Sequence, residues 1–236
     1  MPVSDPTASP VPTPVARVRG LRVDYRTASG TVPALRGVDV DLPAGALVVI
    51  AGPSGSGKST LLRVLAGLQR PAAGSVEVAG HELTRLPAAR RRRLRRRRLG
   101  VVLQDPADNL VPYLTARQQV RLAAQLRGVA DGEVDDLLAL VGLAHRAGDL
   151  PAALSGGEQQ RLGFVAAAVG TPAVLLADEP TAELDGASGA ALVESMRALV
   201  DAGASLVVSS HDPAVVTAAD RVVRLRDGAL DVREGG

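Results

Sequence analysis

The sequence predicts an α/β fold with a mainly parallel sheet, an N-terminal set of antiparallel strands and an inserted helical segment. Strand-like apolar runs alternate with helix-like segments along much of the 236 residues. A glycine-rich loop at 52–57 separates one such run, ALVVI, from the helix-like STLLRVLAGL. The stretch from about residue 84 to 150 has helical spacing instead of this alternation. These three patterns indicate a helical lobe inserted into an α/β core.

Each element of this fold has its own local pattern. Residues 17–50 alternate apolar and polar side chains and turn at glycines, and 75–83 repeat this on a smaller scale. The continuous apolar runs at 46–50 and 173–177 are typical of buried parallel strands. Helical spacing predicts helices within 115–129, 131–143 and 186–203. A strand precedes His211, and Asp227-Gly228 marks the turn of a final hairpin.

Composition and length set the domain organisation. We expect one domain over residues 17–236, with a helical subdomain at approximately 84–160. The first 16 residues hold five prolines and no apolar run, which predicts a disordered tail rather than a signal peptide. No apolar run reaches the roughly 18–20 residues that span a bilayer, so membrane spans are expected on another chain. With no Cys and three His, disulfides and thiolate sites are excluded and a multi-His metal site is disfavoured.

The loop GPSGSGKST fits the phosphate-binding pattern G-x-x-x-x-G-K-[ST] in full. Glycines let successive backbone N–H groups point inward at an anion, and the N-terminus of the following helix adds a favourable dipole. A Gly/Ser-rich turn with an incidental Lys is the structural alternative, and the strand and helix on either side disfavour it. The residues that this loop supplies for nucleotide binding are Gly52, Pro53, Ser54, Gly55, Ser56, Gly57, Lys58, Ser59 and Thr60.

Two further segments place polar groups beside predicted elements. Asp178 and Glu179 follow a buried strand, where an Asp can hold Mg²⁺ and a neighbouring Glu can polarise an attacking water. LSGGE at 154–158 precedes a helix. Ser155 and Glu158 could form a capping box there, but a capping box does not require two glycines. Gly156 and Gly157 also leave an N–H surface that suits a terminal phosphate.

Together these segments resemble the ATP-binding cassette of ABC transporters. The resemblance covers roughly residues 20–230, and the order and spacing of all six motifs agree. It implies a P-loop NTPase (RecA-like) core, an N-terminal antiparallel β subdomain and an inserted helical subdomain. The corresponding motifs are Walker A at 52–60, the Q-loop at Gln104, the signature at 154–158, Walker B at 174–179, the D-loop at Asp185 and the H-loop at His211.

The resemblance also implies a role for each of these residues. Tyr25 would stack on adenine, and ATP would close a head-to-tail dimer with a second copy or a related cassette. Each ATP would lie between Lys58 of one chain and the signature of the other, with Asp185 coupling the two sites. The implied catalytic residues are Glu179, His211, Lys58 and Gln104. The implied Mg²⁺ residues are Ser59, Gln104 and Asp178. The nucleotide-binding residues beyond the phosphate loop are Tyr25, Ser155, Gly156, Gly157, Glu158 and Asp185.

Within the family, the chain is similar to the lipoprotein-release and macrolide-export branch, which is LolD- and MacB-like with FtsE nearby. The resemblance to this branch rests on the stretch NLVPYLTARQQV at 109–120. The branch implies a permease partner with a large extracytoplasmic domain, and a location in the cytoplasm, peripheral on the inner face of the cell membrane. Leu103 stands before Gln104 where Phe is frequent, and AELD replaces the commoner GNLD. Neither departure removes a catalytic group.

Residues 90–98 read RRRRLRRRR and hold eight arginines. We interpret this run first as a solvated helix, and second as a contact for anionic lipid headgroups or for an acidic coupling surface. Nucleic-acid binding is disfavoured because the run has no interleaved aromatic side chains. Two other functions stay open at this point. One is an ABC ATPase that acts on nucleic acid or ribosomes, and the other is an FtsE-like mechanical regulator of an extracytoplasmic enzyme.

Overall fold

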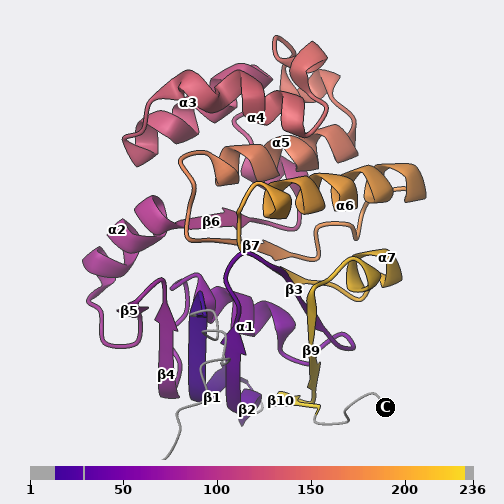
Figure 1. The fold of residues 1–236 in the computed structure, drawn as a ribbon. Helices are drawn as coiled ribbons and strands as arrows, with labels where there is room; N and C mark the ends of the chain where they lie inside the picture. The colour runs from indigo at the N-terminus through magenta and orange to yellow at the C-terminus, as the bar shows by residue number, and fades with distance from the viewer. Residues whose placement is uncertain (1–13, 29, 232–236) are drawn as a thin grey trace, which may run out of the picture.

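Two β-sheets frame the structure, a computed structural model that describes residues 14–28 and 30–231 (Figure 1). The smaller sheet has four antiparallel strands in the order β2-β1-β4-β5. The larger has six strands in the order β10-β9-β3-β8-β7-β6, and only its β9–β10 hairpin is antiparallel. The strands are β1 (Ala16–Thr27), β2 (Gly30–Leu42), β3 (Leu47–Ala51), β4 (Ala73–Val78), β5 (His81–Glu82), β6 (Leu99–Val102), β7 (Val174–Asp178), β8 (Leu206–Ser209), β9 (Arg221–Arg226) and β10 (Ala229–Leu230).

The residues described form seven α-helices, with short 3₁₀ turns between some of them. The α-helices are α1 (Lys58–Leu65), α2 (Ala88–Arg98), α3 (Ala116–Arg127), α4 (Val134–Leu140), α5 (Gly156–Ala168), α6 (Gly186–Asp201) and α7 (Pro213–Thr217). The 3₁₀ turns are Pro106–Asn109, Asp131–Glu133, Ala144–Arg146 and Pro151–Ala153. In the described ranges no helix is both long and apolar enough to cross a bilayer.

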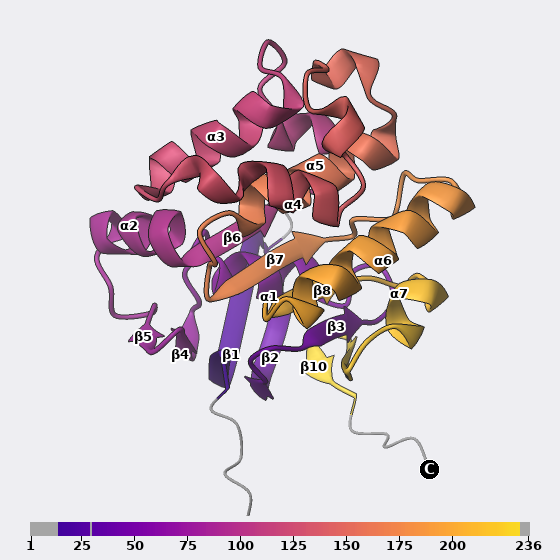
Figure 2. The ribbon, with the colours of Figure 1, turned by 45° about the horizontal axis from the view of Figure 1, so that its top comes forward.

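Strand β3 divides the core because its side chains alternate between the two faces of the sheet. Val48 and Ile50 join the apolar cluster that β1, β2, β4 and α1 complete. Leu47 and Val49 join the cluster on the opposite face, which α5 and α6 cover. Every residue of β3 is buried, as expected for a parallel strand with both faces covered. A third cluster holds α3, α4 and α5 together, and Figure 1 shows α3 and α4 above α5, which also packs on α6. Figure 2 shows the same helices with the top of the molecule turned forward.

Strand β6 is the element that sequence analysis did not predict. It lies inside the segment 84–160 that was predicted to be helical, yet it pairs in parallel with β7 as an edge strand of the larger sheet. Four apolar residues directly after a helix are too few for periodicity to separate strand from helix. The packing is close, because a Cβ on Gly100 would lie 2.2 Å from Leu175 Cδ2 and 2.5 Å from the Ala167 carbonyl oxygen.

The predicted domain boundaries stay a prediction. Within the predicted helical segment, α2 precedes β6 and lies outside the third cluster, which α3, α4 and α5 form. Helix α5 continues to Ala168, beyond the predicted end at residue 160. The predicted disordered tail at 1–16 falls mostly on residues 1–13, which lie outside the described residues. Its last part differs from the prediction, because Val15 N–H donates to the Leu42 carbonyl at 2.8 Å and Ala16 begins β1.

The α/β prediction is confirmed where it matters for function, at the carboxyl ends of the parallel strands. Strands β3, β8 and β7 are neighbours, with Ile50 opposite Ser209 and Ser209 opposite Asp178. The glycine loop follows β3, Glu179 follows β7 and His211 lies just beyond β8. Ligands bind at this edge in open parallel sheets, so one edge collects all three polar segments.

Candidate functional site

The loop between β3 and α1 has the backbone shape of an anion cradle. Gly55 and Gly57 have φ values of 79° and 102°, which residues with a Cβ rarely adopt. Gly57 also packs too closely for a side chain, because its Cβ would lie 2.6 Å from the Ala34 carbonyl oxygen. Ser56 Oγ is buried in this loop without a hydrogen-bond partner. An orphaned hydroxyl beside exposed backbone N–H groups fits a loop that receives phosphate oxygens.

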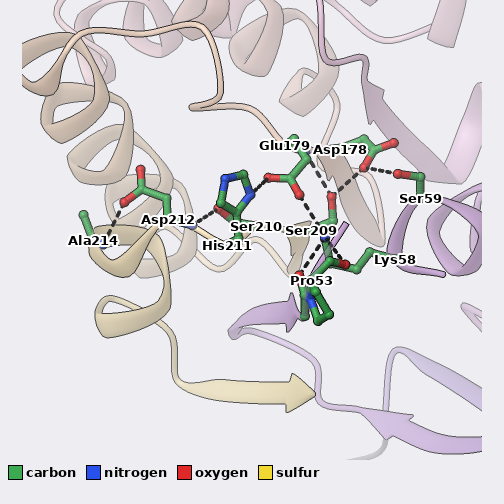
Figure 3. Close-up of polar contacts among 11 residues, drawn as sticks. Pro53, Lys58, Ser59, Asp178, Glu179, Ser209, Ser210, His211, Asp212 and Ala214 are labelled. Carbon is green, nitrogen blue, oxygen red and sulfur yellow. Dashed lines mark hydrogen bonds and ion pairs between the residues drawn. The ribbon is translucent and has the colours of Figure 1, made fainter. Parts of the chain in front are cut away.

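Lys58 is folded back over the loop and is almost fully buried (Figure 3). Its Nζ donates to the carbonyl oxygens of Gly52 at 2.9 Å and Pro53 at 3.3 Å. It also forms an ion pair with Glu179 Oε1 at 3.2 Å, in which the exposed fractions of the two side chains are 7% and 15%. A buried ammonium needs an anionic partner, and Glu179 is that partner in this structure.

Asp178 lies at the end of β7, between two serine hydroxyls. Ser59 Oγ donates to Asp178 Oδ1 at 2.9 Å, and Ser209 Oγ donates to the same oxygen at 2.5 Å. Ser209 Oγ also accepts the Glu179 backbone N–H at 3.0 Å. Sequence analysis missed Ser209, which is fully buried at the end of β8. The available signal was a polar side chain at the end of an apolar strand, two residues before His211.

Glu179 is the meeting point of the site. Its backbone has a φ of 44°, a value uncommon for a residue with a side chain, and this turns the carboxylate away from the strand. One carboxylate oxygen contacts Lys58, and the other contacts His211 Nδ1 at 3.0 Å. The His211 side chain is 68% exposed, so it bridges the buried carboxylate and the surface (Figure 3).

Gln104 lines a hollow of ≈ 350 Å³ that also reaches Asp178. Asp178 and Leu62 form part of its wall, and Asp105 and Glu183 add negative charge at its sides. The structure therefore brings Gln104 and Asp178 to one cavity, although no hydrogen bond joins them in the described residues. In those residues, no group of three or more His, Asp or Glu side chains could hold a metal by itself. A metal ion here would need oxygens from a phosphate as well.

Tyr25 lies on β1 beside the start of α1. Its hydroxyl shares a hydrogen bond with Thr60 Oγ1 at 3.2 Å and donates to Gln69 Oε1 at 2.8 Å. The side chain is 37% exposed. These bonds fix the ring next to the phosphate loop, within reach of whatever is attached to a bound phosphate.

Of the two structures that the sequence leaves open at the signature, the capping box is present. Ser155 caps α5, with its Oγ accepting the Glu158 N–H at 3.3 Å and its own N–H donating to Glu158 Oε2 at 2.8 Å. The Ser155 N–H, assisted by Arg146, holds the pKa of the Glu158 carboxyl below its ordinary value. Gly157 admits no side chain, because its Cβ would lie 2.7 Å from Ser188 Cβ. The capping box is thus real, and the glycines have a separate packing reason.

Asp185 caps α6, and its Oδ1 accepts the Ser188 N–H at 2.8 Å. This bond lowers the pKa of the Asp185 carboxyl below its ordinary value. Asp185, Ser155 and Gly156 are all exposed to solvent. No hydrogen bond or ion pair in the described part of the chain links residues 52–60 to residues 154–158. Within one chain the phosphate loop and the exposed start of α5 are thus two separate features.

Comparison with known protein families identifies the family to which this chain belongs. The sequence matches the ABC transporter family (ABC_tran) over residues 35–182, more than half of the chain. The chain belongs to the ABC transporter family. As an ABC cassette it is an ATP-binding, ATP-hydrolysing subunit, and the fold class, the family and the ATPase activity predicted from sequence are confirmed.

Similar proteins named for lipoprotein release and macrolide export support the same family. The chain is 39% identical to the lipoprotein-releasing system ATP-binding protein LolD 2 of Caulobacter vibrioides, over 93% of this chain and 98% of that one. It is 41% identical to LolD of Ruegeria pomeroyi, over 92% and 97% of the two chains. It is 38% identical to the macrolide export ATP-binding/permease protein MacB of Nitrosomonas europaea, where it spans 92% of its own length and 33% of the relative.

A solved structure supports the fold. The ATP-binding cassette MJ0796, described as a dimeric post-hydrolysis state bound to ADP and Pi, superposes with a TM-score of 0.81. The two chains are 31% identical, over 92% of this chain and 96% of the other. The sheet order and the helical layer of the present chain are therefore those of an ATP-binding cassette.

Proposed function

We propose that two copies of this chain, or this chain and a related cassette, pair head to tail around two ATP molecules and drive a separate transmembrane permease. The observation that carries the proposal is the separation of the phosphate loop from the exposed start of α5 within one chain. In the described residues no hydrogen bond or ion pair joins Lys58 or the phosphate loop to Ser155, and Ser155 and Gly156 are exposed. A partner copy would supply the missing half of each site. The dimeric MJ0796 cassette supports this arrangement.

The residues present fit a nucleotide and a Mg²⁺ ion. Ser56 Oγ is a buried hydroxyl without a partner, and Gly57 leaves no room for a side chain beside the loop. Ser59 and Asp178 place two oxygens 2.9 Å apart, and Gln104 shares a cavity with Asp178. We assign Ser59, Asp178 and Gln104 to the metal. Mg²⁺, when bound with ATP, would neutralise charge on the β- and γ-phosphate oxygens.

The remaining roles follow from where each side chain lies. Lys58 is positioned to hold the terminal phosphates, because its ammonium lies over the loop that binds them. Glu179 is the general base, since its carboxylate lies beside the phosphate loop and can orient and deprotonate a water. His211 positions that carboxylate through its 3.0 Å contact. Tyr25 offers an aromatic face next to the loop for the adenine ring, and Asp185 lies exposed where a partner copy would couple the sites.

We infer the permease and the location from the relatives. Proteins named for lipoprotein release and for macrolide export match this chain over more than 90% of its length. The MacB relative is named an ATP-binding/permease protein. We therefore propose a permease partner with a large extracytoplasmic domain, and a peripheral position on the inner face of the cell membrane. A mechanical regulator would use the same cassette and would differ in moving no cargo through reconstituted vesicles.

The decisive experiment removes the base without changing the shape of the site. Glu179→Gln should bind ATP, lose hydrolysis and accumulate as a dimer in ATP, as measured by phosphate release and size-exclusion chromatography. Glu194→Gln, on the exposed face of α6, makes the same charge change away from the site and should behave like the wild type. Lys58→Ala should weaken nucleotide binding itself. Wild-type turnover from Glu179→Gln would refute the assignment of the base.

A further inference from the structure

Helix α2 has an unusual composition for a surface helix. It contains eight arginines and no acidic residue, and its only buried side chain is Leu94. Pro87 precedes it and offers no side-chain cap to the first turn. Figures 1 and 2 show α2 at the outer edge of the molecule, below α3 and beside β6. One leucine therefore anchors an eleven-residue helix whose other contacts are made by charged side chains.

The charges of α2 repel one another, and only the four arginines of its last turn are favoured, by the negative end of the helix dipole. Like charges three and four positions apart on a helix face each other and destabilise it. In α2 such pairs include Arg90 with Arg93, Arg93 with Arg97 and Arg92 with Arg96. Arginines in the first turn also oppose the positive end of the helix dipole. A helix exposed only to water would carry acidic residues at these spacings, and α2 has none, which weakens the interpretation as a solvated helix.

The arginines of α2 also lack partners elsewhere. None of them forms an ion pair in the described residues, and the hydrogen bond from Arg95 Nη1 to the Gly67 carbonyl, at 3.3 Å, is the one side-chain bond they make there. Arg91 Nε and Nη1 are buried with no partner. Burial, together with the neighbouring Arg70 and Arg95 charges, lowers the pKa of the Arg91 guanidinium below its ordinary value. The helix presents strong hydrogen-bond donors, and residues 14–28 and 30–231 supply no anion that pairs with them.

Two shallow hollows lie along the arginine side chains. The first, of ≈ 390 Å³, has Leu86 and Leu94 among its lining and is rimmed by His81, Arg90, Arg93, Arg97 and Arg98. The second, of ≈ 360 Å³, is lined by Ala89 and by Arg92, Arg93, Arg96 and Arg97. Arg93 and Arg97 lie between the two and belong to both. Each hollow has the size and charge for a small, multiply charged oxyanion.

We propose that the arginine face of α2 binds the phosphate groups of anionic lipid headgroups and so attaches the cassette directly to the bilayer. The proposal rests on the proposed function, which places the chain at a membrane. Guanidinium groups match phosphate oxygens with paired hydrogen bonds. Repeated small sites on one exposed helix suit a surface of many headgroups. Nucleic acid fits less well, because no Phe, Tyr or Trp side chain lines either hollow to stack on a base.

The test measures binding of the full chain to vesicles without nucleotide or permease. Vesicles containing phosphatidylglycerol should bind the wild-type chain in a flotation assay, and pure phosphatidylcholine vesicles should not. Arg93→Gln with Arg97→Gln should lower the partition coefficient about 30-fold, at about 1 kcal/mol for each basic residue and 1.4 kcal/mol for each tenfold change. The matched control is Arg22→Gln with Arg36→Gln, which removes an exposed cross-strand pair and should change binding less than about twofold.

A second variant separates the role of charge from a failure to fold. Arg93→Lys with Arg97→Lys keeps both charges but loses the paired guanidinium hydrogen bonds, so it should bind vesicles up to about threefold more weakly than wild type and clearly more tightly than the Gln variant. A loss equal to that of the Gln variant would overturn the proposal. So would an equal loss in the Arg22 and Arg36 control, because binding would then follow net charge alone.

The identity of the anion is tested in parallel. A chain that binds inorganic phosphate but no vesicles, or that binds a duplex oligonucleotide more tightly than vesicles, would refute a lipid partner. The lipid contact and the proposed ATPase function are tested by different measurements. ATP hydrolysis without vesicle binding removes only the lipid contact, and vesicle binding without hydrolysis removes only the ATPase assignment.

Discussion

Ser209→Ala tests whether a buried hydroxyl holds the carboxylate end of β7 in place. Ser209 Oγ is fully buried, donates to Asp178 Oδ1 at 2.5 Å and accepts the Glu179 N–H at 3.0 Å. The Glu179 N–H keeps a second acceptor, the Ser209 carbonyl, also at 3.0 Å. The main loss is therefore one hydrogen bond to a charged group, which contributes about 1.5–3 kcal/mol.

The control is Ser195→Ala. Ser195 is also buried, but its Oγ donates at 2.8 Å to the carbonyl of Ala191 within α6. That bond is neutral, so its loss should cost only about 0.5–1 kcal/mol. At about 2–4 °C per kcal/mol for a chain of this size, Tm should fall by about 3–12 °C in Ser209→Ala and by about 1–4 °C in Ser195→Ala.

Thermal unfolding followed by circular dichroism measures both changes. The ATPase assay adds a second readout, because without the Ser209 hydroxyl the Asp178 carboxylate keeps only the hydrogen bond from Ser59 Oγ among the described residues. Ser209→Ala should need more Mg²⁺ for half-maximal hydrolysis, and Ser195→Ala should not. Equal melting temperatures and an equal Mg²⁺ requirement in the two variants would show that Asp178 does not depend on the Ser209 hydroxyl.

Two further predictions concern packing and pH. Gly100→Ala should destabilise the chain by about 1–3 kcal/mol in urea unfolding, because the new Cβ would lie 2.2 Å from Leu175 Cδ2, whereas Gly132→Ala, with no neighbour within 4 Å, should change stability by less than about 0.5 kcal/mol. The Leu47 N–H, which donates to Asp220 at 2.7 Å, is the main cause of a pKa for the Asp220 carboxyl below its ordinary value of 3.8. A lowered pKa means that the ionised Asp220 carboxylate stabilises the fold at pH values above 3.8, and this contribution is lost as pH falls below that value. Asp220→Asn should therefore lose less stability than wild type on acidification. Parallel curves of stability against pH for the two proteins would contradict this.

The edge of the parallel sheet was predictable because each segment there has its own sequence pattern. A continuous apolar run ends in the glycine loop, another ends in Asp178, and a third ends near His211. Parallel strands place such ends side by side, so topology alone brings the three segments together. The phosphate loop and Asp178 therefore followed from residue order, without any knowledge of side-chain positions.

Other features depend on side-chain geometry that residue order does not contain. Ser209 looks like any polar residue at a strand end, and only the β7–β8 register shows that its hydroxyl faces Asp178. Strand β6 is four residues long and follows an arginine helix, so no period could be measured. The contact of Lys58 with Glu179 depends on both rotamers and on the positive φ of Glu179.

That contact has a consequence for the order of events during turnover. In this structure the Lys58 ammonium and His211 occupy the two oxygens of the Glu179 carboxylate. Incoming phosphate oxygens compete for the same ammonium, and their greater negative charge should draw Lys58 away. We expect the carboxylate to become free to accept a proton only once the substrate has arrived. Before ATP binds, the Glu179 carboxylate would stay paired with Lys58. Binding of ATP would release this carboxylate to act as the base in hydrolysis of the same ATP.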